Sequence, residues 1–187
     1  MVVLNQIYTR TGDDGTSALG NGERRPKSDT RFAVIGSVDE LNATVGLARL
    51  QAAGEMDARL ARIQNDLFDL GADLAVPEAG ARSRERLRIS AGQVTRLESE
   101  IDALNAGLQP LTSFVLPGGS SLAAALLLCR TVARRAERLM VELAAAEALN
   151  PEALRYINRL SDLFFVAARF ANDSGASDVL WIPGKNR

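Results

Sequence analysis

Apolar residues recur at three- and four-residue steps along most of the chain, a spacing that is typical of amphipathic helices. The steps predict five helices, which cover about residues 29–53, 54–76, 90–104, 120–147 and 150–174. Pro110 and Pro117 bar a helix between the third and fourth segments. No convincing pair of strands is present in the pattern. The predicted fold is therefore all-α, an antiparallel five-helix bundle.

Two of the predicted helices begin with recognisable end signals. Ser90 followed by Gln93 resembles a capping box, and Asn150 with Pro151 is a typical N-cap and first-turn pair. Between the second and third helices lies the charged stretch PEAGARSRERLRIS, residues 77–90, which is poor in large apolar side chains. We expect this stretch to be an exposed loop.

The length of the chain indicates a single domain, because 187 residues are enough to bury one substantial core. Residues 1–28 are expected to form a polar, glycine-bearing N-terminal loop, residues 29–174 the bundle, and residues 175–187 a tail. Hydrophobic residues make up 47% and charged residues 24% of the chain, which argues against disorder.

Composition also excludes several kinds of partner and chemistry. The net charge of -1 argues against a nucleic-acid partner, because phosphate-backbone binders usually carry a basic excess. No apolar run approaches the roughly 20 residues of a membrane span, and the start MVVLNQIYTR lacks the pattern of a secretory signal. We therefore expect a cytoplasmic protein with no membrane partner. The chain has no histidine, so histidine cannot serve as a base or as a metal ligand.

The fourth predicted helix carries a charged group beside its apolar face. Arg130, Arg134 and Glu137 fall within an arc of roughly 60° there, whereas Arg135 and Arg138 point the opposite way, toward solvent. Two guanidinium groups one turn apart, with a carboxylate, could grip a polyphosphate. The alternative is an intrahelical ion pair on a wet surface.

The fifth predicted helix is apolar around most of its circumference, apart from one polar strip. The strip consists of Arg155, Asn158, Arg159, Asp162 and Arg169. A helix of this kind is buried on more than one side. It is either the central helix of the monomer or a helix that also faces a second copy of the chain.

The polar stretch TRTGDDGTS, residues 9–17, can neither bury a helical face nor fill a strand. Its backbone N–H groups could form an anion-binding nest, completed by the hydroxyls of Thr11, Thr16 and Ser17 and by Lys27. A flexible leader is the alternative. The stretch is not a Walker A motif, because asparagine and glycine stand where lysine and serine or threonine are required.

Seven segments, taken together and in this order, resemble the ATP:cob(I)alamin adenosyltransferases of the PduO type. They are YTRTGDDGTS, GERRPKSDTRFAVIGSVDELNA, IQNDLFDLGADLA, FVLPGG, CRTVARRAER, YINRLSDLFFVAAR and VLWIPG. The resemblance covers nearly the whole chain. It implies a five-helix bundle that assembles as a homotrimer, with active sites between neighbouring subunits.

The resemblance implies two sets of ATP-binding residues. One set lies in the N-terminal loop and wraps the nucleotide: Thr9, Arg10, Thr11, Gly12, Ser17, Ala18 and Lys27. The other comes from the neighbouring subunit: Arg134, Arg135, Ala136, Glu137, Arg138 and Asn158. Lys27 would contact the phosphates, and Glu137 would hold a Mg²⁺ ion.

For the corrinoid, the resemblance places Phe114 below the corrin ring and pairs Asp39 with Arg130 across the subunit seam. Arg134, Arg130 and Asp39 would be the catalytic residues. The implied reaction transfers the 5′-deoxyadenosyl group from ATP to the cobalt of reduced cobalamin and releases triphosphate. It implies a Co(II) reductase as a partner, and also an adenosylcobalamin-dependent enzyme that receives the product.

Two other functions are compatible with the same residues. One is a different Mg-ATP enzyme on a helical bundle, such as a phosphotransferase, which would release ADP. The other is a non-catalytic helical adaptor that self-associates and that Mg-ATP would not stabilise.

Overall fold

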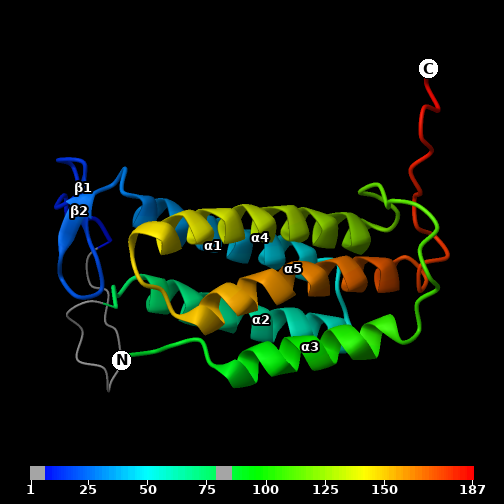
Figure 1. Cartoon of the computed structure of the whole chain (residues 1–187), viewed down its shortest axis with the longest axis horizontal. Coiled ribbons are helices and arrows are strands. Elements are labelled where there is room, and N and C mark those ends of the chain that lie inside the picture. Colours follow the sequence, from blue (N-terminus) through cyan, green and yellow to red (C-terminus); the bar gives the residue numbers. More distant parts are fainter. Residues whose placement is uncertain (1–6, 79–85) are drawn as a thin grey trace.

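The computed structural model describes residues 7–78 and 86–187, which form five long helices, each running antiparallel to the helix before it in the chain (Figure 1). Their bounds are Thr30–Arg49 (α1), Gly54–Leu74 (α2), Ala91–Asn105 (α3), Ser121–Ala146 (α4) and Pro151–Ala171 (α5). The five predicted helices are confirmed, and their ends differ from the prediction by a few residues. Within the described part of the chain, no helix combines the length and the apolar character needed to cross a membrane.

The prediction that no strands pair was wrong, because a small antiparallel hairpin precedes the bundle. It consists of Thr16–Ala18 (β1) and Arg24–Pro26 (β2), with Ser17 opposite Arg25. The turn between them uses Gly22, which adopts a φ of 86° that favours glycine. These strands have three residues each and no apolar alternation, so their hydrophobic pattern gives no strand signal.

Side chains at the helix starts accept backbone hydrogen bonds, as the sequence suggested at two positions. Asn150 accepts from the N–H of Glu152 at 3.1 Å. The predicted reciprocal contact at α3 is present, because the Gln93 side chain accepts from the N–H of Ser90 at 2.9 Å. These contacts satisfy N–H groups that have no partner within the helix.

The expected exposed loop at 77–90 lies partly outside the described residues, which omit 79–85. At the two described ends, Leu87 and Ser90 are exposed as predicted, but the prediction was wrong for other residues. Pro77 and Ile89 are buried, and Arg88 is paired with Glu78 and with Asp73 on α2. The charged side chains of this stretch are therefore tied to the bundle at both of its described ends.

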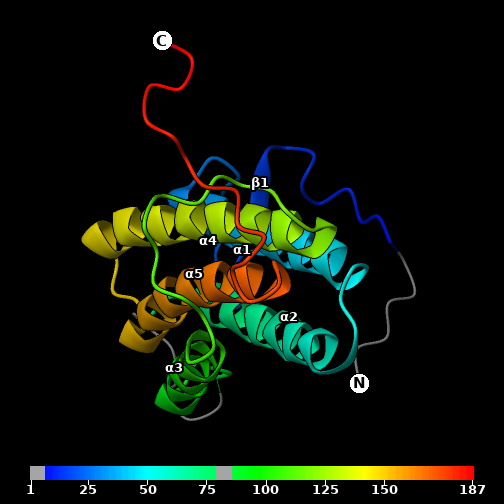
Figure 2. The same ribbon diagram turned by 90° about the vertical axis from the view of Figure 1, so that its right-hand side faces the viewer.

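Helix α5 packs against both α3 and α4, and α1 packs against both α4 and α2. The end-on view shows α5 in the middle of the bundle (Figure 2). Tyr156, Ile157, Leu160 and Phe164 are fully buried within the single chain. The apolar circumference of α5 is therefore explained by the monomer's own core, and this helix does not itself indicate self-association.

The two ends of the bundle carry different structures (Figure 1). The β1–β2 hairpin lies beside the start of α1 and the end of α4. At the opposite end, the segment between α3 and α4 runs beside the C-terminal tail, with an isolated antiparallel bridge between Val115 and Leu180.

Candidate active site

Lys27 and the N-terminal loop lie in direct contact, as the nucleotide-wrap hypothesis requires. The Lys27 ammonium donates to the carbonyl of Gly12 at 2.7 Å, and its backbone N–H donates to the carbonyl of Gly15 at 2.8 Å. A Cβ at Gly12 would lie 3.0 Å from the Lys27 ammonium nitrogen, so this close approach favours glycine.

The remaining loop residues of the predicted ATP set are exposed or half-buried around this contact. The hydroxyls of Thr9 and Thr11 form a hydrogen bond of 2.9 Å. Arg10 adopts a φ of 60°, and its guanidinium lies 5.5 Å from the centre of the Tyr8 ring. Ser17 and Ala18 belong to β1. The loop therefore gathers its predicted nucleotide-binding residues at one end of the bundle.

Within the loop, the Asp14 side chain holds the backbone at Thr16 by hydrogen bonds. Its carboxylate accepts from the backbone N–H of Thr16 at 2.9 Å and from the Thr16 hydroxyl at 2.8 Å, and these hydrogen bonds hold the pKa of Asp14 below its ordinary value. Arg24 donates to the carbonyl of Thr11 at 2.5 Å. These hydrogen bonds give the loop a defined backbone shape.

On α4, two of the predicted phosphate-binding arginines are unpaired. Arg134 and Arg138 are exposed and make no ion pair or side-chain hydrogen bond with any residue that the structure describes. Between them, Glu137 is half-buried and accepts from the side-chain amide of Asn158 on α5 at 2.7 Å. Glu137 and Asn158, both predicted ATP-site residues, are therefore neighbours in the folded chain.

Two other members of the predicted α4 set are differently placed. Ala136 is 0% exposed, so its side chain belongs to the core of the single chain. Arg135 forms an ion pair with Glu40 of α1. The resemblance placed both residues in the ATP set, whereas the helical spacing had directed Arg135 toward solvent.

A cavity of about 530 Å³ lies between α4, α5 and the segment before α4. Its lining is Leu111, Thr112, Ser113, Phe114, Val115, Pro117, Leu127, Arg130, Thr131 and Phe165. Phe114 is 77% exposed, so it is not a core residue. The Arg130 guanidinium lies 5.3 Å from the centre of the Phe165 ring, a cation–π contact that keeps it at the cavity wall.

The C-terminal tail holds the backbone around Phe114. The N–H of Trp181 donates to the Phe114 carbonyl at 2.8 Å, and the Ser113 hydroxyl donates to the Trp181 carbonyl at 2.7 Å. The two rings lie 5.9 Å apart between centres. Sequence reasoning did not assign Trp181 to the site. The one available signal was that Trp181 is the only tryptophan in the sequence. Its contact with Phe114 was not visible, because more than sixty residues separate the two positions.

Asp39 lines a different cavity, of about 430 Å³, between α1 and α2. This cavity shares no lining residue with the one that contains Arg130. No ion pair joins Asp39 to Arg130 among the described residues. The predicted pair therefore does not form within one chain, and it stays a prediction for two.

The described residues contain no group of three or more histidine, cysteine, aspartate or glutamate side chains placed to hold a metal ion. Mg²⁺ is commonly bound by one or two carboxylates together with substrate phosphates. One Glu137 carboxylate oxygen accepts from Asn158. A single carboxylate beside two unpaired arginines fits a magnesium ion that arrives with a triphosphate.

Within a single chain, the N-terminal loop lies far from the cavity that contains Phe114. The hairpin contacts Glu147, the residue that caps the end of α4, through Arg25, whereas the cavity is lined by Arg130 in the first half of that helix. At about 1.5 Å per residue, these two positions are about 25 Å apart. One chain therefore does not bring its own loop to its own Phe114.

The chain matches the family model for cobalamin adenosyltransferase over residues 7–171. A cobalamin adenosyltransferase from Cupriavidus metallidurans is 49% identical over 181 residues, which cover 95% of each chain. A corrinoid adenosyltransferase from Mycobacterium tuberculosis is 48% identical, over 100% of this chain and 97% of that protein.

Solved structures give the same result for the fold. A PduO-type ATP:corrinoid adenosyltransferase from Lactobacillus reuteri, a phenylalanine-to-histidine variant in complex with cobalamin and ATP, superposes with a TM-score of 0.89. It is 38% identical, with 95% of this chain and 97% of that one covered. An arginine-to-lysine variant of the same enzyme, in complex with ATP, gives a TM-score of 0.87 at 39% identity. By family model, sequence identity and fold, this chain belongs to the cobalamin adenosyltransferase family.

Proposed function

We propose that this protein transfers the 5′-deoxyadenosyl group of ATP to the cobalt of cob(I)alamin, at a site formed between two copies of the chain. The observation that carries the shared site is the distance between the N-terminal loop and the Phe114 cavity along α4. A nucleotide held by the loop of one copy meets Arg130, Arg134 and Phe114 of its neighbour. The family membership supports the reaction.

In this reaction, Co(I) is the nucleophile and needs no protein base. Its electron pair forms the cobalt–carbon bond to C5′ of ATP, cobalt becomes Co(III), and the bond from C5′ to oxygen breaks. Triphosphate leaves with the electrons of that bond. The absence of histidine from the sequence is therefore compatible with the chemistry. The protein's task is to align C5′ with cobalt and to neutralise the leaving group.

Charged groups without internal partners suit the leaving group. Arg134 and Arg138 on α4 pair with no carboxylate among the described residues, and the Lys27 ammonium donates to the neutral carbonyl of Gly12. Glu137 would contribute one carboxylate oxygen to Mg²⁺, which would supply further positive charge to the triphosphate. Asn158 orients that carboxylate through its hydrogen bond.

Phe114 would cover the lower face of the corrin and exclude an axial ligand from Co(II), which eases reduction to Co(I). Its exposure and its place in an apolar cavity support this role. One solved relative in complex with cobalamin is a phenylalanine variant. Asp39 of one copy would pair with Arg130 of the next and hold the seam, in a homotrimer.

The proposed substrates also define the surroundings. The protein works with a reductase that supplies Co(I) and with an adenosylcobalamin-dependent enzyme that receives the product. ATP and strongly reduced cobalt suit the reducing cytoplasm, which is where we place the reaction.

Product analysis tests the reaction. With ATP and chemically reduced cobalamin, we expect adenosylcobalamin and triphosphate in equal amounts. Release of ADP instead would identify a phosphotransferase. Failure of Mg-ATP to raise the melting temperature would favour a non-catalytic adaptor.

Light scattering at micromolar concentration tests the shared site. We expect a mass of about three times 20.0 kDa. A monomer with full activity would contradict the proposal, because a single chain would then have to complete the site by itself.

A further inference from the structure

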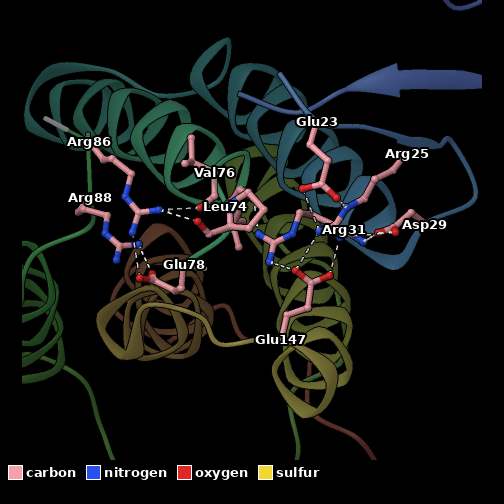
Figure 3. A network of polar contacts seen from close by, with 11 residues as sticks. Glu23, Arg25, Asp29, Arg31, Leu74, Val76, Glu78, Arg86, Arg88 and Glu147 are labelled. Carbon is pink, nitrogen blue, oxygen red and sulfur yellow. Dashed lines mark hydrogen bonds and ion pairs between the residues drawn. The ribbon is translucent and has the colours of Figure 1, made fainter. Parts of the chain in front are cut away.

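A cluster of charged side chains lies at the base of the hairpin and is assigned no role above (Figure 3). We call it the hairpin-base cluster. It consists of Glu23, Arg25, Asp29, Arg31 and Glu147. Its members come from β2 and the turn before it, from α1 and the residue before it, and from the residue that ends α4.

Arg31 forms the buried part of the cluster. It is 1% exposed, and its two terminal nitrogens donate to the carbonyl of Leu74 at 2.6 Å and to Glu147 at 2.7 Å. Leu74 is the last residue of α2, and Glu147 caps α4. A single guanidinium group therefore fixes the ends of three helices relative to one another.

Glu147 also connects the end of α4 to the hairpin. Its second oxygen accepts from Arg25 of β2 at 2.6 Å, while Arg25 also donates to Glu23 at 2.8 Å. These hydrogen bonds from Arg25 hold the pKa of both Glu147 and Glu23 below its ordinary value. Glu147 and Glu23 are therefore ionised at neutral pH.

The hairpin depends on this contact because it has almost no core of its own. Among residues 7–28, Leu19 is the only buried one. A backbone hydrogen bond also attaches the hairpin to the bundle, because the N–H of Gly20 donates to the carbonyl of Ala75 at 2.8 Å. With so little apolar surface buried, polar contacts determine where the hairpin lies.

Arg25 itself is not suited to bind phosphate. Its guanidinium forms ion pairs with Glu23 and Glu147, and it also lies 3.6 Å from the Asp29 carboxylate. The cluster contains three carboxylates and two guanidinium groups, so an incoming triphosphate would meet net negative charge. Any influence of Arg25 on ATP must therefore act through the position of the loop.

We propose that Arg25 is a positioning residue for ATP: through Glu147 and Arg31, it sets the place of the nucleotide loop relative to α4. Lys27 follows Arg25 by two residues, and Ser17 lies opposite Arg25 in the hairpin. Both belong to the predicted ATP set. The proposal rests on the proposed function, because it assumes that this loop binds ATP.

The test compares the full-length protein with Arg25→Ala, Arg25→Lys and Glu147→Gln, using steady-state kinetics and equilibrium binding of Mg-ATP. If the loop occupies its binding position in only about a tenth of Arg25→Ala molecules, the apparent Kd and KM for ATP rise about tenfold. The kcat at saturating ATP and the KM for cobalamin stay close to those of the wild type. Lysine keeps one contact to Glu147 and restores part of the affinity.

The matched control is Arg62→Ala, which removes an arginine from another pair between elements. Arg62 of α2 pairs with Glu100 of α3 at 2.9 Å, and neither is a predicted site residue. We expect its ATP affinity to equal that of the wild type. An equal loss in the control would assign the effect to general destabilisation and overturn the proposal.

A merely structural role would lower the melting temperature without nucleotide and leave the KM for ATP unchanged, which would also overturn the proposal. The same holds for Arg25→Lys and Glu147→Gln if both fold and bind ATP like the wild type. Failure of the proposed function is recognised separately, because the wild type itself would then bind no Mg-ATP or form no adenosyl product.

Discussion

The two ends of this bundle present different groups to a ligand. At the hairpin end, Arg25 and Arg31 lie in ion pairs with carboxylates from distant parts of the same chain, and Arg31 is fully buried. At the other end, Phe114 and Trp181 are exposed, and backbone hydrogen bonds hold their segments together. An ion pair of 2.8 Å between Arg169 and Asp178 also fixes the tail at this end, so the two ends differ in the groups they leave exposed.

This difference indicates which groups are available to a ligand. Arg25 and Arg31 are already neutralised inside the protein, so their role is to hold elements in place. Arg134 on α4 has no partner among the described residues, and Phe114 presents its ring to solvent beside a cavity. An unpaired charge and an uncovered aromatic ring are the features expected to meet the triphosphate and the corrin.

The largest expected effect comes from removing the unpaired charge. Arg134→Ala should lower kcat about a hundredfold, since one lost contact to the leaving group costs on the order of 3 kcal/mol. The melting temperature should change little, because Arg134 is exposed. Turnover and melting curves of the variant measure both quantities.

Arg155→Ala is the matched control, since Arg155 is an exposed helix arginine that pairs with Glu152 and has no assigned role. It should turn over like the wild type. Wild-type activity in Arg134→Ala as well would return Arg134 to the ordinary solvated surface and break the contrast between paired and unpaired arginines.

The second prediction concerns the buried Arg31 at the hairpin end. Arg31→Met removes the donors to Leu74 and Glu147 and should lower the free energy of unfolding by roughly 2–3 kcal/mol, the range for a hydrogen bond to a charged group. Urea unfolding measures this loss. Phe114→Ala in the same experiment should stay within about 0.5 kcal/mol of the wild type, as for an exposed position. Equal losses would remove the distinction between the two ends.

The sequence revealed the helices far better than it revealed these ends. The apolar steps of α1 to α5 are local, so they predict each helix from its own residues. The Arg31–Glu147 pair joins positions 116 residues apart, and the Ser113–Trp181 contact joins positions 68 apart. Local periodicity carries no information about such pairs, which depend on how the helices pack. The resemblance supplied the site residues, but not their partners within the chain.

The third prediction tests the exposed side. Phe114→Ala should admit an axial ligand to Co(II) and slow turnover about tenfold, or 1.4 kcal/mol, in an assay that starts from Co(II). The loss should be much smaller when Co(I) is supplied chemically, and ATP affinity should be nearly unchanged. Running both assays on the same preparation measures the difference. Equal losses in the two assays would exclude the corrin-wall role.

The smallest effect concerns the pH dependence of the hairpin end. Hydrogen bonds from Arg25 and then Arg31 hold the pKa of Glu147 below its ordinary value of 4.5. The ionised carboxylate therefore adds stability that is complete above that ordinary value and is lost as pH falls through the lowered one.

For a partly exposed pair the contribution is up to about 1 kcal/mol. Glu147→Gln should thus be less stable than the wild type near neutral pH, and urea unfolding should show the gap closing as pH falls below 4.5. Glu142→Gln, an exposed α4 position outside the cluster, should show no gap at either pH. A gap for Glu147→Gln that stays constant as the carboxylate is protonated would mean that its charge does not hold the hairpin end together.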